Sequence, residues 1–356
     1  MFKLCFVGAG STIFAKNVIG DCILTPEFGE FKVSLFDIDP ERLDDSYVML
    51  THLNNKYNGK AIITKTLNRR EALQDADFVV FAIQVGGYEP CTVTDFEIPK
   101  KYGLRQTIGD TLGIGGIFRA MRTIHAMEPI CADMKECCPR ALLLNYVNPM
   151  AMVTGYIQKY LWPNTIGLCH SVQGCVYGLF HSLKMLDLFD TCHWKIAGIN
   201  HQAWLYEITD KDGNDLYPEI KRRIASNEYY ETSKWDLVRQ DVCMKFGYYV
   251  TESSEHTSEY TPWYIKSKYP ELIDRYGIPL DEYPRRCVRQ IKEWKELRAK
   301  VTGEGVAHEK SMEFASGIIK GVLNNLPFVV HGNVINNNYI TNLPNGACVE
   351  VKCLVD

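Results

Sequence analysis

Six short segments of this sequence are rich in apolar residues, and stretches of polar and mixed residues separate them. They span residues 3–7, 32–36, 61–66, 77–84, 141–145 and 165–169. A continuous apolar run is typical of a parallel strand that helices cover on both faces, because a half-exposed strand alternates polar and apolar residues. Strands of this kind that alternate with helices predict an α/β protein with a doubly wound parallel sheet.

A glycine turn follows the first apolar segment, where a helix over residues 11–24 is expected to begin. Its key residues are Gly8, Gly10, Ser11 and Thr12. Glycine lets backbone N–H groups approach a pyrophosphate, and the positive end of a helix favours the anion. Ile13 stands where the usual pattern has a third glycine. The turn predicts a Rossmann-type dinucleotide site.

Two further features fit such a site. Asp37 follows the second apolar segment, where a carboxylate can accept from ribose hydroxyls and repel a 2′-phosphate, which favours NAD over NADP. It lies farther from the glycine turn than the usual ~20 residues, and the alternative is that it caps the next helix. Gln84, Gly86 and Gly87 follow the fourth segment, where we expect the backbone to pass close to the cofactor.

The sixth apolar segment ends in Cys169, with His170 next to it. Ligands of open α/β sheets bind at the carboxyl ends of the strands. Cys169 and His201 would supply one sulfur and one nitrogen, which leaves positions for water and substrate oxygens on a catalytic metal. The alternative is that these residues, His170 included, are ordinary packing residues.

Beyond residue 169 the alternation weakens, so we expect a second, α+β domain. We predict an NAD-binding domain over residues 1–168 and a substrate- and metal-binding domain over residues 169–356. Within the second domain we expect a strand over 197–205, a polar and aromatic site loop over 248–260, a helix over 280–301 and a strand over 347–355.

Composition narrows the functional classes. Lys and Arg total 39 against 43 Asp and Glu, which gives a formal net charge of −4, and there is no basic block for nucleic acid. No apolar run approaches the ~20 residues of a membrane span, and the N-terminus shows no secretory leader, so we expect a cytoplasmic protein. The 13 cysteines lie scattered through apolar contexts, as buried thiols in a reducing compartment do.

Several motifs, in consistent order along the whole chain, carry a family resemblance. They are Gly-Ala-Gly-Ser-Thr-Ile-Phe at 8–14, Gln-Val-Gly-Gly-Tyr at 84–88, Asn-Tyr-Val-Asn-Pro-Met at 145–150, Gly-Leu-Cys-His-Ser-Val-Gln at 167–173, Gly-Ile-Asn-His at 198–201 and Glu-Ser-Ser-Glu-His at 252–256. The chain resembles glycoside hydrolase family 4, and within it the melibiase-type α-galactosidases. The resemblance implies NAD⁺, a divalent cation, usually Mn²⁺, and a homo-dimer or homo-tetramer.

The resemblance also implies a mechanism. NAD⁺ oxidises the sugar at C3, the C2 proton is removed, the aglycone leaves by elimination, water adds, and the hydride returns. By resemblance, the metal ligands are Cys169 and His201, the substrate contact is Asn148, the base is Tyr260, the acid that makes this tyrosine more basic is Asp110, and the proton donor is His170.

The resemblance has two departures. Family members that act on phosphorylated sugars carry an arginine near Gln84, so glutamine there predicts an unphosphorylated galactoside such as melibiose. Arg285 or Arg286 could bind sugar hydroxyls. Family members also continue past a strand like 348–355, so we expect this chain to be shorter than they are at its C-terminus.

Two other readings stay open from the sequence. One is an NAD-dependent 2-hydroxyacid dehydrogenase, which shares the cofactor fold but needs an arginine clamp and no metal. The other is a cofactor-binding module without catalysis.

Overall fold

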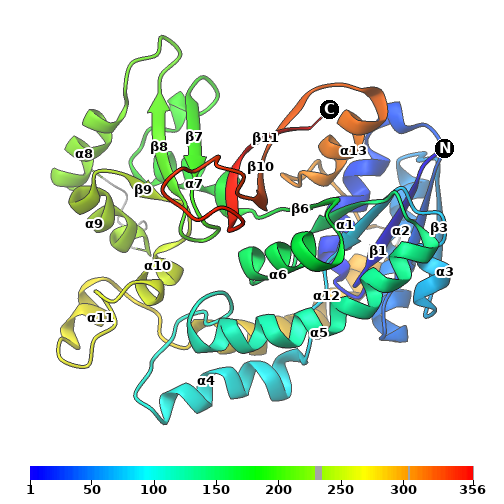
Figure 1. The fold of residues 1–356 in the computed structure, drawn as a ribbon, viewed down its shortest axis with the longest axis horizontal. Coiled ribbons are helices and arrows are strands. Elements are labelled where there is room, and N and C mark those ends of the chain that lie inside the picture. Colours follow the sequence, from blue (N-terminus) through cyan, green and yellow to red (C-terminus); the bar gives the residue numbers. More distant parts are fainter. Residues whose placement is uncertain (229–234, 304, 356) are drawn as a thin grey trace.

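A twisted sheet of eight strands forms the larger part of the molecule (Figure 1). The computed structural model describes residues 1–228, 235–303 and 305–355. In space the strands follow the order β11-β10-β6-β5-β4-β1-β2-β3. The six parallel strands are β1 (Lys3–Val7), β2 (Phe31–Phe36), β3 (Ala61–Thr66), β4 (Phe78–Phe81), β5 (Leu142–Asn145) and β6 (Thr165–Gly167). They correspond to the six apolar segments, and the predicted doubly wound parallel sheet is confirmed.

Two antiparallel strands from the end of the chain extend this sheet. β10 (Phe328–Ile335) pairs with β6 at Asn333 and Gly167, and β11 (Cys348–Val355) pairs with β10 along its length. The expected C-terminal strand is confirmed, whereas β10 was not anticipated. The boundary at residue 168 stays a prediction, and the main sheet takes its last two strands from beyond it.

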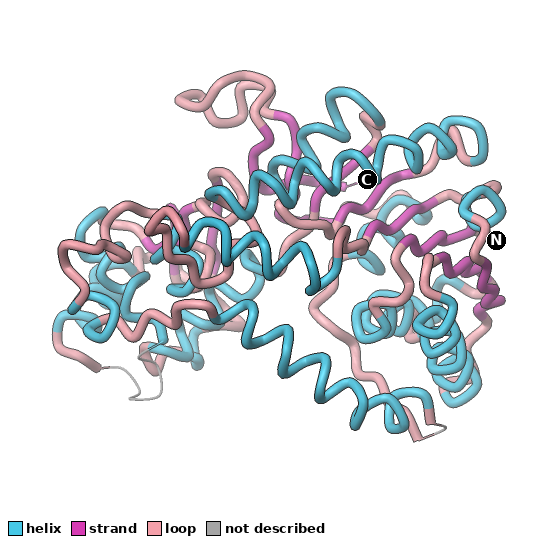
Figure 2. The backbone as a smooth tube through the Cα atoms, turned by 90° about the horizontal axis from the view of Figure 1, so that it is seen from below, coloured by secondary structure: helices cyan, strands magenta, loops and turns pink. Residues whose placement is uncertain are grey.

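Helices cover both faces of the main sheet (Figure 2). One face packs against α1 (Thr12–Ile23), α2 (Pro40–Lys56) and α13 (Ala315–Asn324). The other packs against α3 (Arg69–Leu73), α5 (Gly113–Cys137) and α6 (Met150–Tyr156). Leu4 and Phe6 of β1 belong to the first core, and Cys5 and Val7 to the second. Both faces are buried, which explains why the strands are apolar without alternation.

A smaller body lies beside the main sheet, on the left of Figure 1. Its antiparallel sheet consists of β7 (His193–Ala197), β8 (Trp204–Thr209) and β9 (Tyr249–Val250). The helices of this body are α7 (Ser171–Ser182), α8 (Tyr217–Ala225), α9 (Leu237–Phe246), α10 (Ser254–Tyr260) and α11 (Glu271–Arg275). Apolar side chains of α7, α8 and α9 form a core of their own with β7 and β8.

Two expectations for this body are wrong in detail. The segment expected to be a strand over 197–205 is the end of β7, a turn and the start of β8, and the turn places His201 in the left-handed region at φ 64°. The segment expected to be a loop over 248–260 contains β9 and the helix α10. The Ser253 hydroxyl caps α10 by accepting from the His256 backbone N–H. A helix of two turns is too short to show a clear apolar period.

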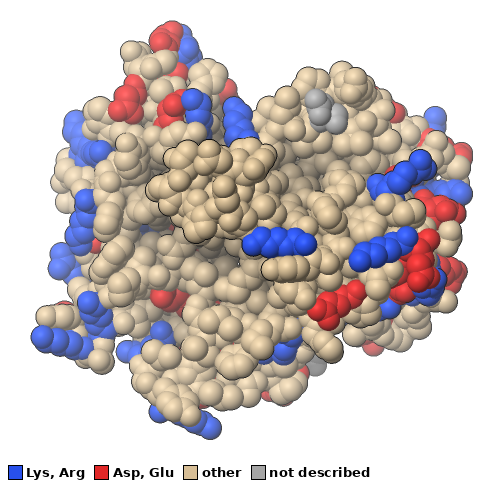
Figure 3. All heavy atoms as spheres, in the orientation of Figure 1, with Lys and Arg blue, Asp and Glu red and all other residues tan. Residues whose placement is uncertain are grey.

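Two more helices, α4 (Val93–Lys100) and α12 (Glu282–Thr302), lie along the lower side of Figure 1. The helix expected over 280–301 is thus confirmed. Among the described residues, no helix combines the length and apolar character needed to cross a membrane. Acidic and basic side chains are interspersed on the face that Figure 3 shows, which agrees with the balanced composition.

Candidate active site

The predicted site residues gather at the carboxyl edge of the main sheet. Gly8 follows β1, Asp37 follows β2, Gln84 lies beyond β4, and Cys169 comes two residues after β6. The carboxyl ends of parallel strands meet at one edge, so segments far apart in the sequence arrive together.

Backbone hydrogen bonds hold the glycine turn against β2. The N–H groups of Gly8 and Ala9 both donate to the Phe36 carbonyl, at 2.9 and 3.0 Å. Gly8 has φ 95°, and a Cβ atom there would lie 2.5 Å from the carbonyl oxygen of Ala82. This position therefore needs glycine both for its conformation and for the close approach of β4.

Asp37 belongs to this turn. Its Oδ2 accepts from the Gly10 N–H at 2.6 Å, so the carboxylate lies directly against the expected dinucleotide turn. The alternative, that Asp37 caps the next helix, is wrong. Asp39 is the cap of α2, with its Oδ1 accepting from the N–H groups of Glu41 and Arg42.

The second glycine loop adopts left-handed backbone. Gly86 and Gly87 have φ 91° and 61°, and a Cβ atom on Gly86 would collide with the Cys91 sulfur. Gln84, just before them, has an exposed side chain. The loop thus keeps its backbone accessible at the edge of the sheet, where a cofactor is expected.

Three side chains from three segments form a potential metal centre. Cys169 Sγ lies 3.4 Å from His201 Nε2, and this nitrogen lies 3.1 Å from Glu252 Oε2. One ligand atom from each residue lies within 4.8 Å of the others. Sulfur, imidazole and carboxylate together suit a divalent transition metal. Cys169 and His201 were predicted from the sequence, whereas Glu252 was missed, although it lies in the 252–256 motif.

Tyr260 completes this centre on the other side of the His201 ring. Its hydroxyl lies 3.2 Å from His201 Nδ1. Burial raises the pKa of Tyr260 well above its usual value, and the charges of Asp110 and Glu259 raise it further. The surrounding residues therefore hold Tyr260 as a phenol, and its ionisation requires a positive charge or a strong hydrogen-bond donor close by.

Asp110 reaches the same centre through His256. The His256 ring lies between the two carboxylates, with Nδ1 3.6 Å from Glu252 Oε1 and Nε2 3.9 Å from Asp110 Oδ1. Glu259 holds the loop that carries Asp110, because its carboxylate accepts from three consecutive backbone N–H groups, those of residues 107–109. The contacts of His256 and Glu259 were not predicted from the sequence, because they depend on the path of the loop that carries Asp110.

His170 is not one of the three clustered side chains and binds a different partner. Its Nε2 lies 2.6 Å from Glu313 Oε1, and this hydrogen bond raises the pKa of His170. The His170 ring contacts the rings of Phe14 and Tyr146, so it lies between the metal centre and the start of α1. More than half of its side chain is exposed, which leaves it accessible to a ligand.

The expected substrate-binding residues lie in different environments. Asn148 Oδ1 is buried and has no hydrogen-bond partner among the described residues, as expected for a group that awaits a ligand. Arg286 Nη2 binds Glu255 of α10 at 3.0 Å, close to the centre. Arg285 instead binds Glu282 on its own helix and has an exposed side chain, so these contacts do not bring it to the centre.

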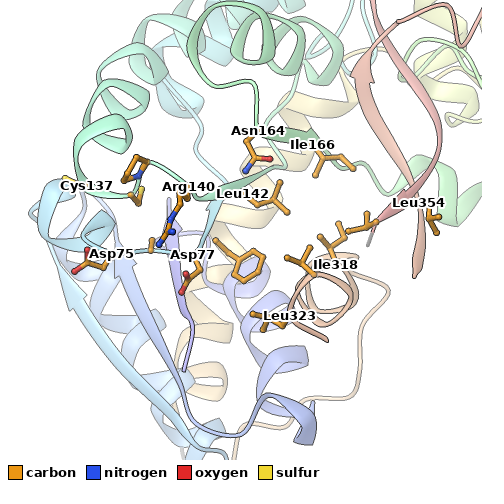
Figure 4. A pocket seen from close by; sticks show the side chains of 16 residues that line it. Asp75, Asp77, Cys137, Arg140, Leu142, Asn164, Ile166, Ile318, Leu323 and Leu354 are labelled. Carbon is orange, nitrogen blue, oxygen red and sulfur yellow. The ribbon is translucent and has the colours of Figure 1, made fainter. Parts of the chain in front are cut away.

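A hollow in the surface lies elsewhere. It has a volume of about 820 Å³ and opens at the amino ends of β4, β5 and β6, where Asp77, Leu142 and Asn164 line it (Figure 4). None of its lining residues is a predicted site residue. The chemistry-bearing side chains therefore lie at the opposite edge of the sheet.

Known proteins are similar to this chain in sequence and in fold. The family 4 glycosyl hydrolase profile matches residues 3–185, and the profile of that family's C-terminal domain matches residues 196–356. An α-galactosidase of Bacillus subtilis (strain 168) is 55% identical over 100% of this chain and 82% of its own length. One of Rhizobium meliloti (strain 1021) is 33% identical over 100% of this chain and 74% of its own length.

A solved structure shows the same fold. It is a 6-phospho-α-glucosidase from gut microorganisms in complex with NAD and Mn²⁺, with a TM-score of 0.76 and 23% identity. The match covers 99% of this chain and 81% of that one. The two profiles together span nearly the whole sequence, and the site residues come from both parts. This chain therefore belongs to the family 4 glycosyl hydrolases.

Proposed function

We propose that this enzyme hydrolyses unphosphorylated α-galactosides such as melibiose, with NAD⁺ and a divalent cation such as Mn²⁺. The observation that carries the proposal is the convergence of Cys169, His201 and Glu252 next to Tyr260, at the sheet edge where a dinucleotide is expected. The names of the two α-galactosidase relatives support the substrate class. The NAD and Mn²⁺ of the solved structure support the cofactors.

The residues fit both groups. The glycine turn and the start of α1 would hold the pyrophosphate, and Asp37 would bind ribose hydroxyls and disfavour a 2′-phosphate. Cys169, His201 and Glu252 would hold the cation and leave room for sugar oxygens. When bound, NAD⁺ supplies a reversible hydride acceptor for C3 of the sugar, and the cation supplies a Lewis acid for the sugar oxygens.

Tyr260 is the proposed base for the C2 proton. Because His201 Nε2 points toward Cys169 and Glu252, Nδ1 can carry the ring proton and donate it to the Tyr260 oxygen. A donor at this position favours the phenolate and so opposes the effect of burial on the pKa of Tyr260. The charge of Asp110 acts in the other direction and makes the phenolate a stronger base.

His170 is the proposed donor of a proton to the departing glycosidic oxygen. Its hydrogen bond with Glu313 favours the charged imidazolium, which is the form that can donate. Asn148 would place its unpartnered amide oxygen against a sugar hydroxyl. Gln84 offers no cation at its position, which supports a neutral hexose, and Arg286 is the better placed of the two arginines to contact it.

An omission assay tests the proposal. The full chain is incubated with an aryl α-galactoside, NAD⁺, Mn²⁺ and a thiol reductant, and each component is then left out in turn. Loss of cleavage without NAD⁺ and without Mn²⁺ is expected, together with a slower reaction or loss of label when C2 carries deuterium. Cleavage that persists with a chelator and no cofactor would contradict the proposal.

The same assay separates the other readings. Net accumulation of NADH with a 2-hydroxyacid would indicate a dehydrogenase, and NAD⁺ binding without turnover would indicate a silent module. A cytoplasmic location and a homo-dimer or homo-tetramer stay predictions, which fractionation and light scattering can test.

A further inference from the structure

We propose that Glu350 is a positioning residue that fixes the separation between Cys169 and His201. It lies on β11, in the last strand of the chain, and is fully buried. Its carboxylate is not among the three clustered ligand groups. The inference rests on the metal centre of the proposed function. It adds the residue that connects the segment of Cys169 with the segment of His201.

Glu350 binds the turn that carries His201 through both its backbone and its side chain. Its backbone exchanges two hydrogen bonds with Gly198, from Gly198 N–H to the Glu350 carbonyl at 3.1 Å and from Glu350 N–H to the Gly198 carbonyl at 2.8 Å. Its side-chain Oε1 accepts from Asn200 Nδ2 at 3.0 Å. Glu350 thus holds the turn both at its start and at the residue before His201.

The same carboxylate oxygen reaches the strand that leads to Cys169. Oε1 also accepts from Asn333 Nδ2 at 3.2 Å, and this amide donates to the Gly167 carbonyl of β6 at 3.3 Å. Gly167 lies two residues before Cys169 and pairs with Asn333 in the sheet. One oxygen atom therefore connects the two segments that carry the two metal-binding side chains.

The turn needs such support from outside. His201 has φ 64°, a conformation that costs a non-glycine residue free energy and persists only where its surroundings impose it. The turn joins two strands of the smaller sheet, whereas Cys169 follows a strand of the main sheet. Contacts across the two sheets must therefore set the 3.4 Å between Cys169 Sγ and His201 Nε2.

The network is buried and consists of polar side chains alone. Asn200 and Asn333 are at most 1% exposed, and Glu350 is not exposed at all. Burying a carboxyl and two amides is unfavourable unless they are hydrogen-bonded, so the two bonds to Oε1 stabilise this arrangement. The other oxygens of these side chains, Glu350 Oε2, Asn200 Oδ1 and Asn333 Oδ1, are buried without a partner among the described residues. An apolar side chain could fill the same space, but it could not accept a hydrogen bond from either amide.

The test compares Mn²⁺ binding among variants of the full chain by calorimetry or by EPR of free Mn²⁺. Glu350→Leu keeps the volume but removes the acceptor, and Mn²⁺ affinity should fall by about 10- to 100-fold, as loss of supporting contacts around metal ligands does. Glu350→Gln keeps Oε1 as an acceptor and should bind Mn²⁺ within about threefold of wild type. NAD⁺ affinity should be unchanged in both.

A matched control separates positioning from general stability. Asn336 is also buried near the end of β10, and its amide donates to the carbonyls of Ile340, Leu343 and Pro344, away from the metal centre. Asn336→Leu should lower the melting temperature and leave Mn²⁺ affinity as in wild type. Asn333→Ala is a milder break of the network, for use if Glu350→Leu does not fold, and it should weaken Mn²⁺ binding.

The outcomes are distinct. Wild-type Mn²⁺ affinity in folded Glu350→Leu or Asn333→Ala would overturn this inference and leave the metal centre standing. Equal weakening in Asn336→Leu would overturn it as well, because the effect would then be one of stability. A wild-type chain that binds no Mn²⁺ would overturn the metal centre of the proposed function, and this inference with it.

Discussion

The proposed dinucleotide turn and the proposed metal centre lie at the same edge of one sheet but are built differently. In the turn, β1 and β2 pair with each other, and backbone N–H groups of Gly8, Ala9 and Gly10 bind Phe36 and Asp37. The metal centre consists of one side chain each from residues 169, 201 and 252, which follow strands of two different sheets.

This difference has consequences for what each region tolerates. Backbone atoms make most of the contacts of the turn, so truncation of the Asp37 side chain removes one contact and leaves the others. In the metal centre, His201 contacts Cys169, Glu252 and Tyr260 through side-chain atoms, so removal of any one of them leaves the His201 ring without that partner. We therefore expect substitutions in the metal centre to cause larger losses of ligand affinity than substitutions in the turn. We also expect a substitution in one region to leave ligand binding in the other region unchanged.

The largest expected effect follows removal of the sulfur ligand. Cys169→Ala should weaken Mn²⁺ binding by more than about 100-fold, since even the contacts around metal ligands are worth 10- to 100-fold. Cleavage should be lost in parallel, with NAD⁺ affinity unchanged. Calorimetric titration with each ligand measures both. Cys192→Ala is the control, a half-buried thiol before β7 whose removal should leave both affinities alone.

A smaller effect is expected at the turn. Asp37→Ala should weaken NAD⁺ binding by about tenfold, or about 1.4 kcal/mol, the lower range for a hydrogen bond to a charged group. Discrimination against NADP⁺ should fall, because the repulsion of a 2′-phosphate is removed. Fluorescence titration with both cofactors measures this. A parallel loss of Mn²⁺ affinity in Asp37→Ala would show that the two regions do not act independently.

The contact between Glu259 and the loop that carries Asp110 can be tested through the pH dependence of stability. Burial raises the pKa of Glu259 from 4.5 to about 7. Between these values the folded protein keeps a proton that the unfolded chain has lost, so the stability from Glu259 is lost as pH rises from about 4.5 to 7. Over this range, the contribution of Glu259 to the free energy of unfolding falls by at most about 1.4 kcal/mol per pH unit.

Glu259→Gln removes this titration. In urea unfolding from pH 5 to 8, the free energy of unfolding of wild type minus that of the variant should fall up to about pH 7 and then stay constant. A difference that is constant over the whole range would show that Glu259 is ionised in the folded protein throughout.

The smallest effect is expected beside Asp37. Asp39→Ala removes the cap of α2 and should cost about 1 kcal/mol of stability, with NAD⁺ affinity unchanged. Thermal unfolding and a cofactor titration check the two parts. If Asp39→Ala and Asp37→Ala lost NAD⁺ affinity to a similar extent, the position of α2 rather than the Asp37 carboxylate would determine cofactor binding at the turn.

The two regions also differ in how far they could be predicted. Residues 3–37 contain strand, turn, helix, strand and carboxylate in order, and the structure shows each of them. β10 was missed, although Phe328–Ile335 is largely apolar, because His331, Gly332 and Asn333 interrupt its apolar run. Residues 248–260 were taken for a loop because β9 and α10 are too short to show a period.

The sequence by itself determined the six parallel strands of the main sheet and the dinucleotide turn, and the family resemblance added Cys169 and His201. The strands and the turn depend on local patterns: apolar runs, glycine spacing, and the fact that parallel strands end at one edge. Only the tertiary structure decided that Glu252 completes the centre, that His256 and Glu259 place Asp110, and that Glu350 holds the turn of His201. The physical reason is that such contacts join segments whose meeting depends on how whole sheets and helices pack, which no local pattern records.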